Sequence, residues 1–137
     1  MARSNLDIID DFFIAYGGHD QRGLQRVLAE DVKWIFPGQN PLSGTYSGIW
    51  EVVEFFDTMG SIMRKSNTKV DPLVMGSSTD HVVQCQHIRT NRDDGRDLDH
   101  YWCVLWTLEK GKIVEGRHLS SEQREADEFF NGVLQSS

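Results

Sequence analysis

Residues 80–119 constrain the fold more than any other stretch, because they are typical of three successive antiparallel strands. Turn-forming residues at Arg92–Gly95 and Glu109–Gly111 divide this stretch, and glycine tolerates the positive φ that hairpin turns need. The segments between the turns are rich in aromatic and β-branched residues, which suit a half-buried pleated surface. We therefore predict a three-stranded meander formed by Val82–Thr90, Asp97–Leu108 and Lys112–Leu119.

Apolar residues at helical spacing lie on both sides of the predicted meander. They predict four helices, for which the candidate N-terminal caps are Ser4, Asp20, Ser47 and either Ser120 or Ser121. Two further strands are predicted at residues 31–36 and 69–76, with Pro72 indicating an edge or a bulge, and residues 38–48 have the composition of a loop. This order indicates a single α+β domain over residues 1–137, in which a curved, mostly antiparallel sheet wraps the N-terminal helices.

Charge and composition narrow the kinds of partner. With a net charge of −7 and a pI near 5.1, the chain lacks the basic surface by which proteins bind nucleic-acid phosphates. No apolar run approaches the length of a membrane span, and the first residues do not resemble a signal peptide. We expect a cytoplasmic protein without nucleic-acid or membrane partners. Cys85 and Cys103 match no metal or redox spacing and are expected to be reduced.

Four segments of the chain resemble the nuclear-transport-factor-2-like superfamily, in particular its SnoaL-like and ketosteroid-isomerase-like enzymes. They are FFIAYGGHD (residues 12–20), VLAEDVKWIFPG (27–38), LSGTYSGIWEVVEFF (42–56) and LEKGKIVEGRHLS (108–120). The resemblance implies a cone-shaped fold, in which a strongly bent sheet is closed by helices over a deep apolar pocket. It also implies a homodimer, and the predicted outer face of the sheet is apolar enough to need a cover, at Tyr101, Cys103 and Leu105.

The same resemblance excludes the machinery of the ketosteroid isomerases. Their carboxylate base falls at Phe36, their oxyanion-binding tyrosine at about Phe12, and their second acid near Cys103 or Val104. None of these residues supplies the chemistry that the isomerases need. Isomerisation of a steroid by that route is therefore not expected.

The limonene-epoxide-hydrolase branch of the superfamily offers a different set of positions, because its last three strands are spaced as they are here. Its two catalytic aspartates fall at His87 and His118, and its bridging arginine falls at Cys85. SnoaL-type cyclases likewise place an acid at about His118. The resemblance thus implies that two imidazoles stand where related enzymes carry carboxylates.

Strand parity indicates that three histidines share one face of the meander. A turn centred on residues 93–94 would place His87 directly opposite His100. His118 would then lie near Trp102 on the same side. Imidazole suits acid–base work at neutral pH, and an apolar wall lowers its pKa. We predict His87 and His118 as proton carriers and His100 as their orienting partner.

Two other interpretations of the histidines stay open. Three imidazoles could hold a zinc ion, but the HExxH and CxxC signatures are missing, and we expect neither a metal nor an organic cofactor. A single inward-facing histidine is also commonly a structural core residue. The same holds for the residues predicted to line the pocket, which are Tyr16, Trp34, Phe36, Cys85, Trp102, Val104 and Trp106.

The sequence as a whole predicts a SnoaL-like enzyme for a small hydrophobic molecule, of the isomerase, cyclase, dehydratase or hydrolase type. Its acid–base groups would be the histidines of the pocket. The alternative is a non-catalytic module that binds a hydrophobic metabolite in the same pocket.

Overall fold

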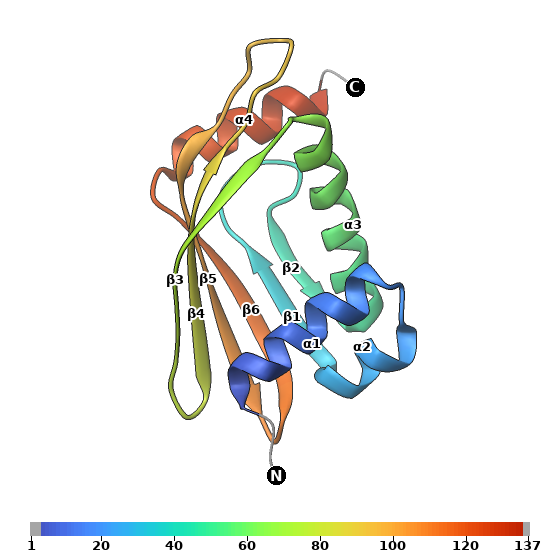
Figure 1. The fold of residues 1–137 in the computed structure, drawn as a ribbon. Helices are drawn as coiled ribbons and strands as arrows, with labels where there is room; N and C mark the ends of the chain where they lie inside the picture. Colours follow the sequence, from blue (N-terminus) through green and yellow to red (C-terminus); the bar gives the residue numbers. More distant parts are fainter. Residues whose placement is uncertain (1–3, 136–137) are drawn as a thin grey trace.

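Within residues 4–135, which the computed structural model describes, one curved sheet carries the strands in the order β2-β1-β6-β5-β4-β3. Neighbouring strands are antiparallel, except that β1 and β6 run parallel. Figure 1 shows α1, α2 and α3 on the concave side of the sheet and α4 across one end. The bounds are α1 Asn5–Gly17, α2 Gln21–Val27, β1 Leu28–Phe36, β2 Gly44–Ser47, α3 Ile49–Lys65, β3 Lys69–Ser77, β4 His81–Arg89, β5 Asp99–Glu109, β6 Lys112–Ser120 and α4 Gln123–Gln135.

The predicted α+β class, the curved sheet and the meander are confirmed. One strand was missed, because β2 lies inside the segment predicted to be a loop. It is a short edge strand that pairs with β1, with Tyr46 opposite Trp34. The segment before it is rich in turn-forming residues, and four strand residues are too few to show an alternating pattern.

Local sequence signals explain where several elements begin and break. The Ser4 hydroxyl accepts a hydrogen bond from the Asp7 amide at 3.1 Å, and the Asp7 carboxylate accepts one from the Ser4 amide at 3.3 Å, which confirms the predicted capping box. The register of β3 shifts just after Pro72, as predicted. The cap predicted at Ser47 is wrong, since α3 starts from Gly48 with φ 89° and without a side-chain cap.

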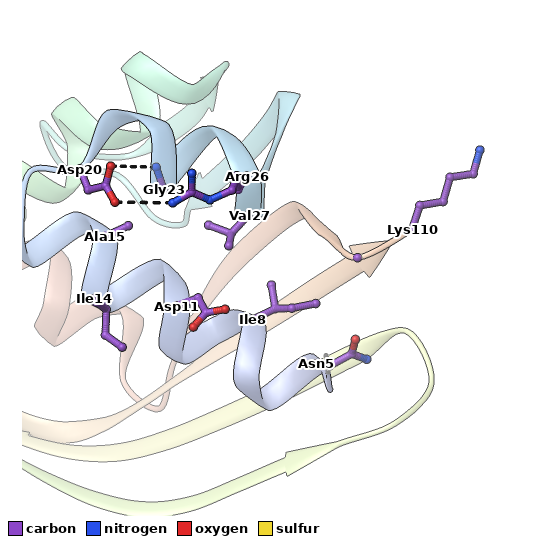
Figure 2. A pocket seen from close by; sticks show the side chains of 11 residues that line it. Asn5, Ile8, Asp11, Ile14, Ala15, Asp20, Gly23, Arg26, Val27 and Lys110 are labelled. Carbon is purple, nitrogen blue, oxygen red and sulfur yellow. Dashed lines mark hydrogen bonds and ion pairs between the residues drawn. The ribbon is translucent and has the colours of Figure 1, made fainter. Parts of the chain in front are cut away.

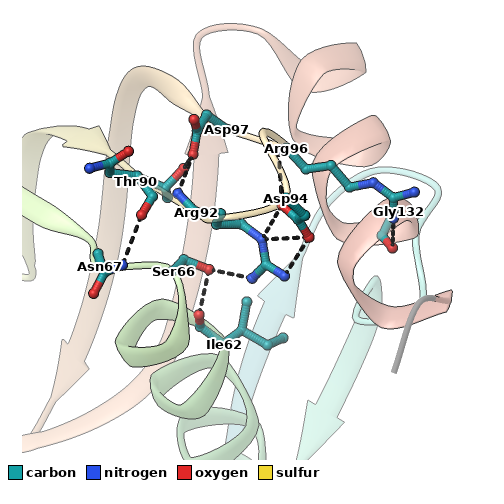
Figure 3. Close-up of polar contacts among 10 residues, drawn as sticks. Ile62, Ser66, Asn67, Thr90, Arg92, Asp94, Arg96, Asp97 and Gly132 are labelled. Atoms are coloured by element: carbon teal, nitrogen blue, oxygen red, sulfur yellow. Dashed lines mark hydrogen bonds and ion pairs between the residues drawn. The ribbon is translucent and has the colours of Figure 1, made fainter.

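The loop between β4 and β5 is tied to the helices rather than left free. Arg92 donates from Nη1 to the buried Ser66 hydroxyl at 2.9 Å, and Arg96 donates to the Gly132 carbonyl of α4 at 2.5 Å (Figure 3). The Asp94 carboxylate accepts from Arg92, and this hydrogen bond lowers the pKa of Asp94 to about 2. The loop therefore holds the C-terminal parts of α3 and α4 against the meander.

The pairing register of β4 and β5 differs by one residue from the predicted register. Arg89 lies opposite Asp99, so the turn is centred on Asp94 and not between residues 93 and 94. Consequently His87 faces Tyr101 across the strands, and His100 faces Ile88. A slip of one residue moves a side chain to the other face of a sheet. The predicted pairing of His87 with His100 is therefore wrong.

The core between sheet and helices is built on a tryptophan that packs closely against a glycine. Trp34 of β1 neighbours Gly116 of β6 in the parallel pair, and a Cβ atom on Gly116 would overlap the Trp34 ring. Trp106 meets Trp34 edge-on at a centroid distance of 4.9 Å, and both indoles are about as buried as a side chain can be, at 1% exposure. Gly116 therefore makes room for the central aromatic pair.

Substituting Gly116 by Ala should lower the free energy of unfolding by about 1–3 kcal/mol, because the added methyl group displaces the Trp34 ring from a closely packed core. Chemical denaturation followed by circular dichroism measures this loss. Gly76→Ala is the matched control, since a Cβ at this strand position meets nothing within 4 Å. Equal stability of the two variants would contradict the packing role of Gly116.

Candidate functional site

The strand register brings three side chains into one row across the concave face of the sheet. Val104 of β5 lies opposite Gln84 of β4 on one side and opposite His118 of β6 on the other. We call Gln84, Val104 and His118 the His118 row. Two positions before and after Val104 along β5, Trp102 and Trp106 point to the same face, so two indoles flank the row.

His118 is enclosed by aromatic rings. It is 7% exposed, and the rings around it have centroids 5.1–5.8 Å away, those of Phe36, Trp102, Trp34 and Phe55. Burial lowers the pKa of His118 to about 3. The imidazole is therefore neutral at pH 7, with one nitrogen able to donate a hydrogen bond and the other able to accept one.

Several polar atoms of this region have no partner among the residues that the structure describes. They are both ring nitrogens of His118, the indole nitrogens of Trp34 and Trp106, and the Ser120 hydroxyl. Buried polar atoms are nearly always hydrogen-bonded, so unpartnered ones mark a place where water or a ligand supplies the missing partner. Two indole N–H groups and a neutral imidazole make this a site richer in donors than in acceptors.

His100 is also buried but lies apart from His118. It is 3% exposed, and burial lowers its pKa. The negative charges of Glu125, Asp99 and Glu122 act in the other direction and raise the pKa, but burial has the larger effect. His100 lies four positions before Val104 along β5, which corresponds to roughly 13 Å. The Trp102 ring stands between the two imidazoles, 5.9 Å from His100 and 5.2 Å from His118. His100 therefore does not orient His118.

His87 lies on the convex face, away from His118 and His100. Its Nε2 lies 2.6 Å from an Asp99 carboxylate oxygen, and its ring stacks on Tyr101 at 5.0 Å. The predicted convergence of three imidazoles is therefore wrong, and the physical reason is the one-residue register. Cys85 moves to the convex face with His87 and does not line the predicted pocket.

On the concave face, β4 presents Gln84 and Gln86 in place of the predicted Cys85 and His87. Neither glutamine was predicted from the sequence as a site residue. Both are half-buried on the concave face, opposite Val104 and Trp102 respectively. The sequence contains a pattern that predicts their orientation. Gln84 and Gln86 alternate with the same period as the apolar Val82 and Ile88, so all four point to one face of the strand.

The other predicted lining residues fall into two groups. Trp34, Phe36, Trp102 and Val104 gather around His118, and Trp106 borders the row. Tyr16 does not reach it, because its hydroxyl donates to Asp57 of α3 at 2.7 Å. Burial and this hydrogen bond raise the pKa of Tyr16 to about 12.

Two surface cavities formed by the described residues lie away from His118. One of about 810 Å³ sits between α1, α2 and the turn after β5, bordered by Asp11, Arg26 and Lys110 (Figure 2). Another of about 560 Å³ lies between α3, α4 and the loop that carries Arg92. Neither borders His118. Among the residues that the structure describes, no three His, Cys, Asp or Glu side chains are grouped so as to hold a metal ion.

Comparison with known proteins places this geometry in a family. A family model described as a SnoaL-like domain matches residues 9–116. The chain belongs to the SnoaL-like family. Its sequence is 23% identical over 127 residues to the uncharacterised protein Rv0034 of Mycobacterium tuberculosis, across 93% of this chain and 96% of the relative.

Solved structures share the SnoaL-like architecture. A nuclear-transport-factor-2-like protein from Burkholderia xenovorans has a TM-score of 0.73 and 24% identity, covering 93% of this chain and 95% of the other. TerC, co-crystallised with polyporic acid, has a TM-score of 0.66 and 19% identity, covering 90% and 97%. At these identities the likeness concerns the fold. No helix within residues 4–135 is both long and apolar enough to cross a bilayer.

Replacing His118 by Leu should flatten the acid side of the stability curve of this SnoaL-like protein. The pKa of the imidazole falls from about 6.5 in the unfolded chain to about 3 in the fold, so the unfolded chain binds a proton that the native one excludes. The effect of His118 on the free energy of unfolding follows from this difference. The fold loses no stability through this group above pH 6.5, and it loses progressively more as the pH falls toward 3. Without His118, the slope of the free energy of unfolding against pH should be smaller by about 1.4 kcal/mol per pH unit between these two pH values.

Urea denaturation at a series of pH values measures this slope. His81→Gln is the control, because it removes an exposed imidazole at the start of β4. An unchanged acid slope in the His118 variant would show that the imidazole is not buried as a neutral group.

Proposed function

We propose that the protein binds a small, neutral, largely aromatic molecule against the concave face of its sheet, with His118 as the polar contact. The observation that carries this proposal is a neutral imidazole, buried among aromatic rings, with neither ring nitrogen partnered. Such a group stabilises a fold poorly by itself, since an unsatisfied buried polar group costs about 1–3 kcal/mol. A ligand that hydrogen-bonds to it recovers that free energy.

The charge of the ligand follows from the side chains of the concave face. Along β4, β5 and β6, the inward positions near the His118 row carry Gln84, Gln86, Trp102, Val104 and Ser120, which are neutral. A carboxylate or phosphate would meet no cation there and would lose its hydration without compensation. A ketone, quinone or enol oxygen suits the indole and imidazole donors.

The position of β3 and β4 supports access to this face. Met75 lies opposite Gln84, so it extends the His118 row to the sheet edge, and it is 39% exposed. Phe13 of α1 is 41% exposed. These half-covered apolar side chains distinguish the β3 side from the closed β1 side, where Trp34 and Phe36 are buried. A ligand would enter from the β3 side.

Two roles fit this binding site, and the stronger one geometrically is binding without chemistry. The second proton carrier predicted from the sequence, His87, faces away from His118, so no imidazole pair flanks the ligand. The alternative role is acid–base catalysis by His118 alone. A neutral imidazole can donate a hydrogen bond to a carbonyl oxygen and polarise it, which is the favourable first half of an isomerisation or cyclisation.

The membership in the SnoaL-like family and the co-crystallisation of TerC with polyporic acid support a small-molecule ligand in either role. Location in the cytoplasm remains a prediction of the sequence.

The neutral two-ring ketone α-tetralone tests both roles. Binding should quench the fluorescence of Trp34, Trp102 and Trp106, and a Trp50→Phe background removes the tryptophan that is 50% exposed. His118→Leu should weaken binding about 10-fold, because one hydrogen bond of roughly 1 kcal/mol and its desolvation are lost. Exchange of the α-hydrogens in heavy water, followed by NMR, reports proton transfer on the same molecule.

The outcomes separate the alternatives. Binding without accelerated exchange supports the binding module, whereas exchange that disappears in His118→Leu supports catalysis. A tetralone carboxylate is the matched charged control and should bind more weakly. If tetralone binds equally to the wild type and to His118→Leu, His118 is not the polar contact.

We further propose a homodimer formed through the convex face. A row of apolar or weakly polar side chains crosses that face, in which Val74 and Leu119 flank the two cysteines, and Tyr101 lies beside it. Val74, Tyr101 and Leu119 are 57%, 54% and 47% exposed, which is unusual for neighbouring large apolar side chains.

Leu119→Glu should convert the dimer to a monomer, because it places a charge within the apolar patch. Sedimentation velocity over a range of concentrations measures the state. Ile14→Glu is the control, since Ile14 is 73% exposed on α1 and lies outside the patch. A wild-type chain that stays monomeric at every concentration would refute the dimer.

A further inference from the structure

Two cysteines meet at the centre of the convex face. Cys85 of β4 lies directly opposite Cys103 of β5, and the Cys103 thiol donates toward the Cys85 sulfur at a distance of 2.7 Å. Both are free cysteines and both are half-buried. Eighteen positions separate them in the sequence, so only the strand register brings them together.

The backbone around the pair already has the geometry of a cross-link. Directly opposed residues in an antiparallel pair have Cα atoms about 4.5–5.5 Å apart, and disulfides span about 4.4–6.8 Å. Continuous pairing on either side, Gln84 with Val104 and Gln86 with Trp102, holds the two strands in this position. The two sulfurs therefore need little backbone movement to bond.

We propose that Cys85 and Cys103 form a reversible thiol–disulfide site, oxidised by low-molecular-weight disulfides such as oxidised glutathione. The proposal does not depend on the ligand-binding role of the concave face, and it concerns the single chain, in which the convex face is uncovered.

The reaction is two successive thiol–disulfide exchanges. The thiolate of Cys85 attacks one sulfur of the small disulfide, whose other half leaves as a thiolate and takes up a proton. The Cys103 thiol then loses its proton and attacks the Cys85 sulfur of the mixed disulfide, which expels the second small thiol. Two protein thiols and one small disulfide become one protein disulfide and two small thiols.

The hydrogen bond between the two sulfurs suggests the order of attack. The Cys85 sulfur accepts the hydrogen of the Cys103 thiol, and accepting a hydrogen bond favours a thiolate, so we assign the first attack to Cys85 and the resolving step to Cys103. Burial and the same hydrogen bond raise the pKa of Cys103. Because each exchange proceeds through a thiolate, closure should accelerate as the pH rises from neutral.

The cross-link would act on the site behind it. Gln84, Gln86, Trp102 and Val104 are the chain neighbours of the two cysteines and point to the opposite face of the same strands. A disulfide would join β4 to β5 directly beneath the His118 row. It would thereby restrict any separation of these strands when a ligand enters.

Equilibration of the full chain with mixtures of reduced and oxidised glutathione tests the proposal. After acid quenching, denaturation and alkylation with N-ethylmaleimide, intact-mass spectrometry counts the free thiols. The wild type should pass from two alkylated cysteines to none, without bound glutathione and as a single chain. Its Tm should rise by about 5 °C and return on reduction with dithiothreitol, as for a cross-link that closes a short loop.

The single variants Cys85→Ser and Cys103→Ser identify the roles. Each should retain one cysteine, and Cys85 in the Cys103→Ser variant should accumulate a persistent glutathione adduct that the wild type does not. Circular dichroism establishes that each variant is folded. The equilibrations use a low protein concentration, because association of two chains through the convex face would cover the thiols.

Three results would overturn the proposal. The wild type could keep two alkylatable thiols in every glutathione mixture, it could retain glutathione as the single variant does, or it could form a disulfide between two chains. Closure at a rate independent of pH would refute attack by a thiolate, and a persistent glutathione adduct on Cys103 in Cys85→Ser but none on Cys85 in Cys103→Ser would reverse the assigned order.

Discussion

The pairing of β4 with β5 decides which side chains of the meander face the helices. With His87 opposite Tyr101, the glutamines of β4 point inward and its cysteine and histidine point outward. The glutamines of the concave site and the two cysteines of the convex site owe their positions to this register, since side chains alternate along a strand. The register is consistent with the loop between the strands, which Arg92 ties to Ser66 at the end of α3. Loop anchoring and core packing thus favour the same pairing.

The concave face combines dense aromatic packing with unpartnered polar atoms, two properties that are seldom found together. It is packed with aromatic rings, as a core requires, yet it retains imidazole and indole nitrogens without partners in the described part of the chain. A purely structural core would place apolar side chains at these positions, because unpartnered polar atoms cost stability. Polar atoms held unsatisfied in an aromatic surrounding are expected where a ligand completes the structure.

Much of the fold could be predicted from the sequence, because long periodic segments carry strong signals. The capping box at Ser4, the apolar faces of the helices and the bulge after Pro72 are local features, and the structure confirms them. The site was harder to predict, because it depends on register. Assigning the turn centre half a residue too early paired His87 with His100, and the same error concealed that Cys85 and Cys103 are neighbours. His118 was placed on the correct face because a short turn, Lys110–Gly111, fixes its strand.

The odd number of loop positions between Arg89 and Asp99 has a consequence for how the chain can vary. An insertion of two residues in this loop preserves parity, so both faces of β4 and β5 keep their side chains. An insertion of one residue leaves the faces unchanged when the loop itself absorbs it, whereas a one-residue shift of the pairing would exchange the glutamines of the concave face with the cysteine and histidine of the convex face. Length changes that keep Arg89 opposite Asp99 are therefore the ones that the concave face and the thiol pair can tolerate together.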